Sequence, residues 1–301
     1  MTREPVKQNS KSATAETPPR VKEWRRFSRV FLGRKLVVFG LIVIIVFAFV
    51  AILAPLIAPY TANTPDLTST LQGPSFKHLL GTDALGRDTL SRIIYGTQIS
   101  LEVGLLVVAV ACLAGIILGT VAGYYGGWTY SIIMRLIDAL MSFPMILLAM
   151  VITALMGSGT RNVVIALSVA MMPAFARVMC AQVLSVKTND YIEACRSIGA
   201  SNLRIMIRHV TPNCFPPLIV LSTMMLGSVI LVEAGLSFLG IGIKPPTPTW
   251  GNMINDGRQY LLTLPILSFA PGGALMLLIF AFNMVGDGLR DALDPRLRGI
   301  L

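Results

Sequence analysis

The sequence predicts an all-α integral membrane protein with about six transmembrane helices. Of its 301 residues, 54% are hydrophobic and 13% are charged, and the mean hydropathy is +0.71. In soluble domains, about a quarter of all residues are charged. The apolar residues also gather in blocks of roughly twenty, the length that an α-helix needs to cross a hydrocarbon layer of about 30 Å. A lipid bilayer is therefore the expected surrounding of most of the chain.

The chain begins with a basic tail. Residues 1–35 hold ten of the 25 Lys and Arg residues, and the first 23 positions lack hydrophobic periodicity, which predicts partial disorder. A basic segment directly before an apolar span is typical of the cytoplasmic side of a membrane. Nucleic-acid binding would favour interleaved aromatic residues, of which the tail offers only Trp24, Phe27 and Phe31. We therefore expect the charge to orient the chain in the membrane, with no nucleic-acid partner.

Six apolar segments follow the tail. The first is too long for a signal-peptide core and is expected to remain as an anchor. With a cytoplasmic N-terminus, six spans place nineteen Lys and Arg residues inside and six outside, which favours an N-in, C-in topology. Prolines at 144, 173, 216, 217 and 271 are expected to kink their helices. The expected spans cover residues 36–58, 101–124, 136–156, 163–182, 215–234 and 265–285.

These spans divide the chain into four parts. The parts are a basic cytoplasmic tail (1–35), the first span with an external segment (36–97), the main transmembrane domain (98–290) and a short cytoplasmic C-terminal tail (291–301). The external segments 59–97 and 236–263 are long for connectors and are expected to be functional or to face a partner. Within the first, residues 88–95 predict a short surface helix that ends at Gly96.

The segment between the fourth and fifth spans predicts a cytoplasmic pair of short helices. Asn189 or Asp190 can cap the first helix, and Gly199 can supply a left-handed turn residue. Ser201 can cap the second helix, which Pro212 is expected to end. Such a hairpin either lies on the lipid surface or buries an apolar stripe against a partner protein. The stripe consists of Tyr191, Ile192, Cys195 and Ile198.

The same segment resembles a known family. Glu193-Ala194-Cys195, followed by Gly199 and by Pro212-Asn213, resembles the EAA loop of ABC importer permeases. Cys195 replaces the second Ala of that pattern, which should loosen packing slightly without abolishing docking. The resemblance implies a type I ABC importer permease fold, in which this loop forms coupling helices that sit in a cleft of a cytoplasmic ATPase. It assigns that coupling to Asp190, Tyr191, Glu193, Ala194, Cys195, Gly199, Ala200 and Leu203.

Two external segments indicate which branch of this family the chain resembles. Residues 78–101 (HLLGTDALGRDTLSRIIYGTQISL) and 236–258 (LSFLGIGIKPPTPTWGNMINDGR) resemble the second, "C-type" permease subunit of the dipeptide, oligopeptide and nickel branch. In that branch the outer loops contribute to an external gate and face a solute-binding protein. This implies such a role for Asp83, Arg87, Asp88, Trp250, Asn252 and Asp256. Read without the resemblance, Asp83 and Asp88 are helix caps and Arg87 is a surface residue, and we favour this structural interpretation for these three.

Small residues in the second span predict close helix packing. Ala111, Gly115, Gly119 and Gly123 recur every four positions and therefore lie on one helix face. In a bilayer, such a face allows another helix to approach closely. The sequence leaves open whether that helix belongs to this chain or to a second subunit.

Three acidic residues, Glu102, Asp138 and Glu233, lie in the spans or at their edges. Ionisable groups at such positions are functional candidates by default. Asp138 is one turn from Arg135 near the cytoplasmic end of its span and can pair with it, and the other two fall near the outer ends of their spans. We expect all three to be gate or packing groups. A proton-coupled secondary transporter that uses them is the alternative hypothesis.

The resemblance implies the permease subunit of an ATP-driven importer for peptides or related small solutes, located in a bacterial inner membrane. It would form half of the translocation path with a homologous second permease, two ATPase subunits and an external solute-binding protein. The chain has no GxxxxGK[ST] motif, so ATP and Mg²⁺ are expected to bind the ATPase subunits. Two histidines and four cysteines without CxxC spacing predict no metal site. No catalytic residue or cofactor is expected in this chain. The sequence contains no HExxH motif, so it offers little support for a membrane-embedded hydrolase.

Overall fold

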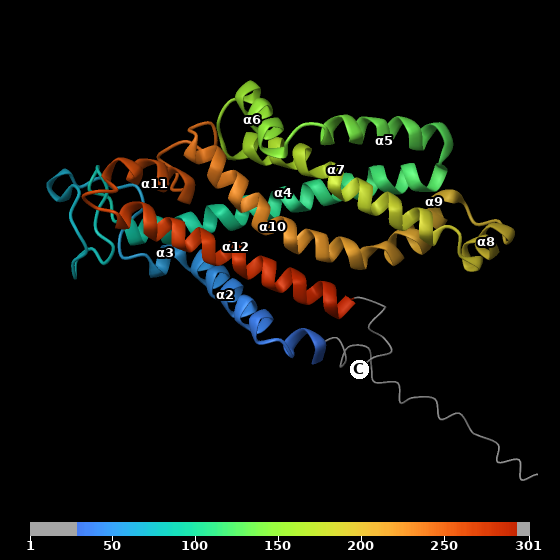
Figure 1. The fold of residues 1–301 in the computed structure, drawn as a ribbon, viewed down its shortest axis with the longest axis horizontal. Coiled ribbons are helices and arrows are strands. Elements are labelled where there is room, and N and C mark those ends of the chain that lie inside the picture. Colours follow the sequence, from blue (N-terminus) through green and yellow to red (C-terminus); the bar gives the residue numbers. More distant parts are fainter. Residues whose placement is uncertain (1–28, 294–301) are drawn as a thin grey trace, which may run out of the picture.

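The computed structural model describes residues 29–293, and this part of the chain is almost entirely helical, with no strand. Residues 1–28 and 294–301, which contain most of both predicted tails, lie outside the described residues. The long helices run roughly along one axis (Figure 1). The short helices α8 (Asp190–Ser197) and α9 (Asn202–Ile205) lie at one end of this bundle, which we call the cytoplasmic end following the predicted orientation.

Five helices are long and apolar enough to cross a membrane, and a sixth span results if a bent pair is counted as one. The long helices are α2 (Lys35–Ile52), α4 (Thr89–Tyr125), α7 (Thr160–Val186), α10 (Phe215–Phe238) and α12 (Ile266–Leu293). The bent pair is α5 (Gly127–Met141) and α6 (Met145–Met156). Shorter elements are α3 (Ala54–Ile57), α11 (Trp250–Gly257) and the single-turn helices η1 (Leu67–Ser69), η2 (Met206–Val210), η3 (Thr211–Cys214) and η4 (Arg258–Tyr260). The five long helices confirm five of the expected spans, and the bent pair lies at the place of the sixth.

The predicted short surface helix at 88–95 was wrong, because these residues form the first turns of the long helix α4. Gly96 does not end the helix. Its missing Cβ leaves room for Trp250, since a Cβ at this position would lie 2.9 Å from Cδ1 of that indole. Packing against Trp250 therefore compensates for the low helix propensity of glycine.

The predicted single span at 136–156 was also wrong, because α5 and α6 meet at an angle of 90°. The break lies at Ser142 and Phe143, directly before Pro144. Proline has no N–H for the helical hydrogen bond and restricts the residue before it, so the helix ends and restarts here. Helix α5 begins at Gly127, nine positions before the predicted start of this span.

The second short helix of the cytoplasmic hairpin does not end at Pro212. Residues 202–238 instead form one rod in which α9, the π-helical turn η2 and the 3₁₀ turn η3 lead into α10. The proline is accommodated because it lies in the first turn of η3, where a helix makes no use of its missing N–H. Asn213 Nδ2 donates to the His209 carbonyl at 2.6 Å, and Cys214 Sγ lies 3.2 Å from that of Val210.

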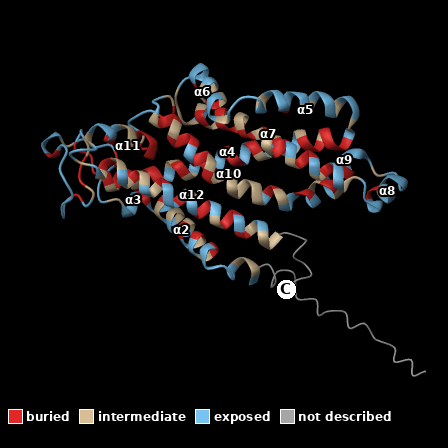
Figure 2. Ribbon diagram, in the orientation of Figure 1, coloured by how far each residue is buried: buried red, intermediate tan, exposed pale blue. Residues whose placement is uncertain are grey.

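The glycine column of α4 packs on α7 of the same chain, which settles the question left open by the sequence. A Cβ at Gly115 would lie 2.4 Å from Cβ of Phe175, and one at Gly119 would lie 2.5 Å from the Ala176 carbonyl oxygen. Gly123 faces Val183 one turn further on. The core of the bundle follows this seam, where buried residues concentrate (Figure 2). The predicted close approach of two helices is confirmed.

Candidate functional site

The cytoplasmic end carries a protruding pair of short helices, residues 190–209, which we call the coupling foot. Gly199 has a φ of +80° and makes the predicted left-handed turn after α8. Ser201 Oγ accepts a hydrogen bond from the Arg204 amide at 3.4 Å and caps α9. Asn189 occupies the N-cap position of α8, but its side chain donates to the Val186 carbonyl and makes no capping bond. The predicted side-chain cap of the first helix was therefore wrong.

Buried side chains and polar contacts hold the coupling foot against the ends of α4 and α7. Ile192 and Ile205 are fully buried in the core cluster of the bundle. Tyr124 Oη donates to Asn202 Oδ1 at 2.8 Å. Lys187 Nζ donates to the Gly123 carbonyl at 2.7 Å, next to the foot. Displacement of the foot must therefore also displace the helices to which it is attached.

The outer surface of the coupling foot exposes large apolar side chains among charged ones. Ile198 is 83% exposed and Leu203 is 62% exposed, with Tyr191 and Ile207 exposed beside them in the chain. Of the eight predicted coupling residues, Asp190, Tyr191, Glu193, Ala194, Gly199 and Leu203 are exposed. Cys195 and Ala200 are half-buried and pack against the core of this chain. The prediction omitted Ile198, which its own helical stripe contained, and Ile207, which lies in the unforeseen π-turn.

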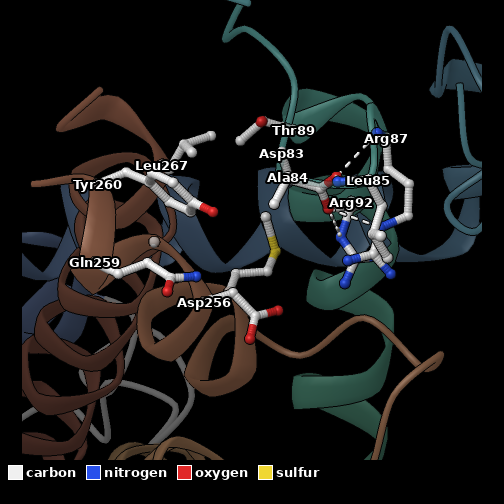
Figure 3. Close-up of a pocket in the computed structure, with 12 residues that line it drawn as sticks. Asp83, Ala84, Leu85, Arg87, Thr89, Arg92, Asp256, Gln259, Tyr260 and Leu267 are labelled. Carbon is white, nitrogen blue, oxygen red and sulfur yellow. Dashed lines mark hydrogen bonds and ion pairs between the residues drawn. The ribbon is translucent and has the colours of Figure 1, made fainter. Parts of the chain in front are cut away.

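A pocket of about 220 Å³ lies at the opposite, external end of the bundle (Figure 3). Its centre is Asp83, whose Oδ1 accepts hydrogen bonds from the amides of Leu85 and Arg87. Asp83 Oδ2 accepts from Arg87 Nε at 2.7 Å and pairs with Arg92 Nε at 3.7 Å. Arg87 is buried, so its interpretation as a surface residue was wrong: the Asp83 carboxylate compensates its charge. Asp83 caps a loop and not a helix.

Asp256 lies across this pocket, near Gln259 and Tyr260 (Figure 3). Desolvation raises the pKa of its carboxyl group, while the nearby charges of Arg92 and Arg87 act in the opposite direction. The pocket therefore brings together three of the predicted external residues and one, Arg92, that the sequence analysis missed. No hydrophobic pattern in the segment GRDTLSR marks Arg92 as buried.

The other predicted external residues have structural contacts outside this pocket. Asp88 caps α4, as predicted, by accepting from the Ser91 amide at 2.8 Å, and it also bonds His78 Nδ1 at 2.9 Å. Trp250 is fully buried and donates from Nε1 to the Ile93 carbonyl at 3.2 Å. Asn252 Nδ2 donates to the Ile243 carbonyl at 2.6 Å.

The three acidic residues of the spans have different surroundings. Asp138 pairs with Arg177 of α7 at 2.5 Å, so the predicted pairing with Arg135 was wrong. Glu233 is 1% exposed, and its Oε1 accepts from Ser237 Oγ at 2.8 Å. Glu102 is exposed on α4, thirteen positions after Thr89, the first residue of that helix. Among residues 29–293, no three His, Cys, Asp or Glu side chains form a group that could hold a metal ion.

A multi-pass helical bundle with a protruding cytoplasmic foot defines the class of type I importer permeases. The fold is similar to a permease chain in inward-facing structures of the MetNI methionine ABC transporter, with a TM-score of 0.56 and 18% identity. That match covers 68% of this chain and 97% of the other. The chain belongs to the family of binding-protein-dependent transport system inner membrane components, whose model matches residues 115–299.

The branch within this family agrees with the predicted one. Residues 22–74 match the N-terminal transmembrane domain of oligopeptide transport permease C. A dipeptide transport system permease of Alkalihalophilus pseudofirmus is 41% identical over 92% of this chain and 91% of its own length. A glutathione transport system permease of Pectobacterium atrosepticum is 44% identical over 91% of this chain and 92% of its own length. These matches give no support to the alternative of a proton-coupled transporter.

Proposed function

We propose that this chain forms half of the translocation path of an ATP-driven importer for peptides or related small solutes in a bacterial inner membrane. The relatives in hand are named for dipeptide and glutathione transport, and both solutes are short peptides. The other half would be a homologous permease, and a solute-binding protein would deliver the solute at the external end. In this proposal, ATP and Mg²⁺ bind two separate ATPase subunits.

The observation that supports the ATPase partner is the exposure of large apolar side chains on the outer surface of the coupling foot. Ile198 and Leu203 lie beyond the spans on a segment held rigidly by the buried Ile192 and Ile205. Exposed large apolar groups on an ordered protrusion indicate a protein partner, because their burial contributes about 25 cal/mol for each Å² removed from water. The foot connects to α7 on one side and to α10 on the other. Closure of the ATPases would thus move the foot and rock the attached helices as rigid bodies.

A matched pair of proline substitutions tests this proposal. Gly199→Pro removes an N–H that donates to the Arg196 carbonyl and forbids the positive φ of the turn. Gly240→Pro makes the same change at the external end, where the glycine has a φ of +79° and donates to Ser237. We expect Gly199→Pro to reduce ATP-dependent peptide uptake at least tenfold and to lose the co-purifying ATPase.

The control variant should keep the ATPase bound, and both variants should still insert into the membrane. Glu193→Lys, which reverses an exposed charge on the foot, should also reduce uptake at unchanged expression. Wild-type uptake in Gly199→Pro and in Glu193→Lys would disprove the proposed coupling role.

A further inference from the structure

An exposed ion pair joins the C-terminal part of α5 to α7. The side chains of Asp138 and Arg177 are 61% and 52% exposed, and they pair through Oδ1 and Nη2. Arg135, one turn from Asp138 on α5, is exposed as well. Three charged groups therefore lie on one face of the bundle that no other described segment covers.

Measured from the cytoplasmic ends of α5 and α7, the pair lies deeper than the cytoplasmic end of the span, where the sequence predicted Asp138 to lie. Asp138 lies eleven positions after Gly127, the first residue of α5 at the cytoplasmic end, which corresponds to about 17 Å at 1.5 Å per residue. Arg177 lies ten positions before Lys187, which follows α7 at the same end, or about 15 Å. Half of a hydrocarbon layer is also about 15 Å.

A charged side chain at this depth does not face lipid. Exposure of one Asp or Arg to the centre of a bilayer costs about 2.5–3.5 kcal/mol on insertion scales, so such groups face protein or a water-filled cavity. The exposed face of α2 shows what lipid contact looks like in this chain. That face consists of Leu36, Phe39, Ile42, Ile45, Val46, Phe49 and Ile52, all large and apolar.

The exposed face of α7 around Arg177 carries fewer large apolar side chains than the exposed face of α2. Around Arg177 it presents mainly small side chains, with Ala174 half-buried one turn toward the external end and with Ala181 and Ser185 exposed toward the cytoplasmic end beside the exposed Leu184. The next residue, Val178, lines a hollow of about 590 Å³ between α7, α10 and α12. Its polar lining residues are Gln182, Asn213 and Arg290. The remaining lining residues are apolar, so polar groups are interspersed with apolar ones between the ion pair and the cytoplasmic end.

We propose that the face of α5 and α7 around Asp138 and Arg177 lines the water-filled solute path, and that the ion pair is its contact point near the membrane centre for a zwitterionic solute. The Arg177 guanidinium would exchange its bond to Asp138 for the carboxylate of the solute, and Asp138 would take the ammonium group. This inference rests on the proposed function as an importer, since it assigns the path through this subunit.

Cysteine labelling in the assembled importer tests the path. In a background without Cys112, Cys180, Cys195 and Cys214, Ala181→Cys places a thiol on the proposed path, and Ile42→Cys places one on the apolar face of α2. We expect a charged, water-soluble thiosulfonate reagent to modify Ala181→Cys at least ten times faster than Ile42→Cys. Equal rates would overturn the inference, and because labelling requires no transport, this result leaves the importer function untouched.

Uptake kinetics test the contact with solute. Arg177→Gln should raise the KM for dialanine at least fivefold but leave the KM for dialanine amide, which lacks the carboxylate, nearly unchanged. Arg177→Lys, which keeps the charge, should recover most of the dialanine affinity. An equal loss for both peptides would overturn the solute contact and assign the pair to packing. If the wild-type importer takes up neither peptide, the proposed peptide function fails, and the labelling result still decides whether this face lines a path.

Discussion

At the scale of single residues, the external pocket shows how charge is stabilised in a largely buried cluster. Arg87 and Arg92 are buried, and Asp83 is the carboxylate that bonds one and faces the other. Arg92 Nη1 also donates to the Ala62 carbonyl at 3.1 Å, which ties the external segment to α4. Removal of the one carboxylate would leave two guanidinium groups without their shared partner.

Asp83→Asn should therefore destabilise the external segment by about 3 kcal/mol, since breaking a buried ion pair leaves an uncompensated charge. Asp66→Asn is the matched control, because Asp66 lies on the same segment, is only half-buried, and its carboxylate accepts hydrogen bonds from the nearby Thr68. The measurement is the rate of limited proteolysis between residues 59 and 88 in the purified protein. Equal cleavage rates for both variants would show that the buried cluster does not stabilise the segment.

At the scale of elements, the α4–α7 seam holds the bundle together through its glycines. Gly115, Gly119 and Gly123 each allow α7 to approach to a distance that any larger residue forbids. Packing of this kind carries helix association in a membrane, where the lipid supplies no hydrophobic force between helices.

Gly119→Ala should lower the stability of the protein by about 1–3 kcal/mol, because the added methyl group would lie 2.5 Å from the Ala176 carbonyl oxygen. Gly273→Ala is the matched control in α12, where an added Cβ meets nothing within 4 Å. The control should be neutral or stabilising by up to about 1 kcal/mol, because alanine is the better helix former. Thermal unfolding in detergent measures both, and a Tm for Gly119→Ala at or above that of Gly273→Ala would contradict the packing role.

Apolar length predicted the five long spans, small-residue spacing predicted the glycine column, and a glycine after a short helix predicted the turn at Gly199. The errors arose where tertiary contacts overrule local signals. Gly96 alone predicts a helix end, but the helix continues through it because the indole of Trp250, more than 150 positions later, packs into the space beside it. The sequence spacing predicts that Asp138 pairs with Arg135 of its own helix, but the packing of α5 on α7 makes Arg177 its partner. Sequence spacing contains no information on such contacts between distant segments.

At the scale of the whole molecule, one continuous helix connects the two ends. α4 begins beside the external pocket, where Asp88 caps it, and it ends at Tyr124 and Tyr125 beside the coupling foot. The rod from Asn202 to Phe238 likewise runs from the foot toward the external segment. Because both ends share rigid helices, motion imposed on the foot has a direct mechanical route to the external surface.

The central claim is that the coupling foot binds an ATP-hydrolysing subunit, and site-specific crosslinking tests it most directly. Leu203→Cys, in a background without the four native cysteines, should crosslink to the ATPase in membranes that contain the whole transporter. Leu262→Cys, fully exposed at the external end, should crosslink to no ATPase. A Leu203→Cys protein that captures no ATP-hydrolysing chain, or that reacts with an impermeant reagent added outside intact cells, would contradict the account.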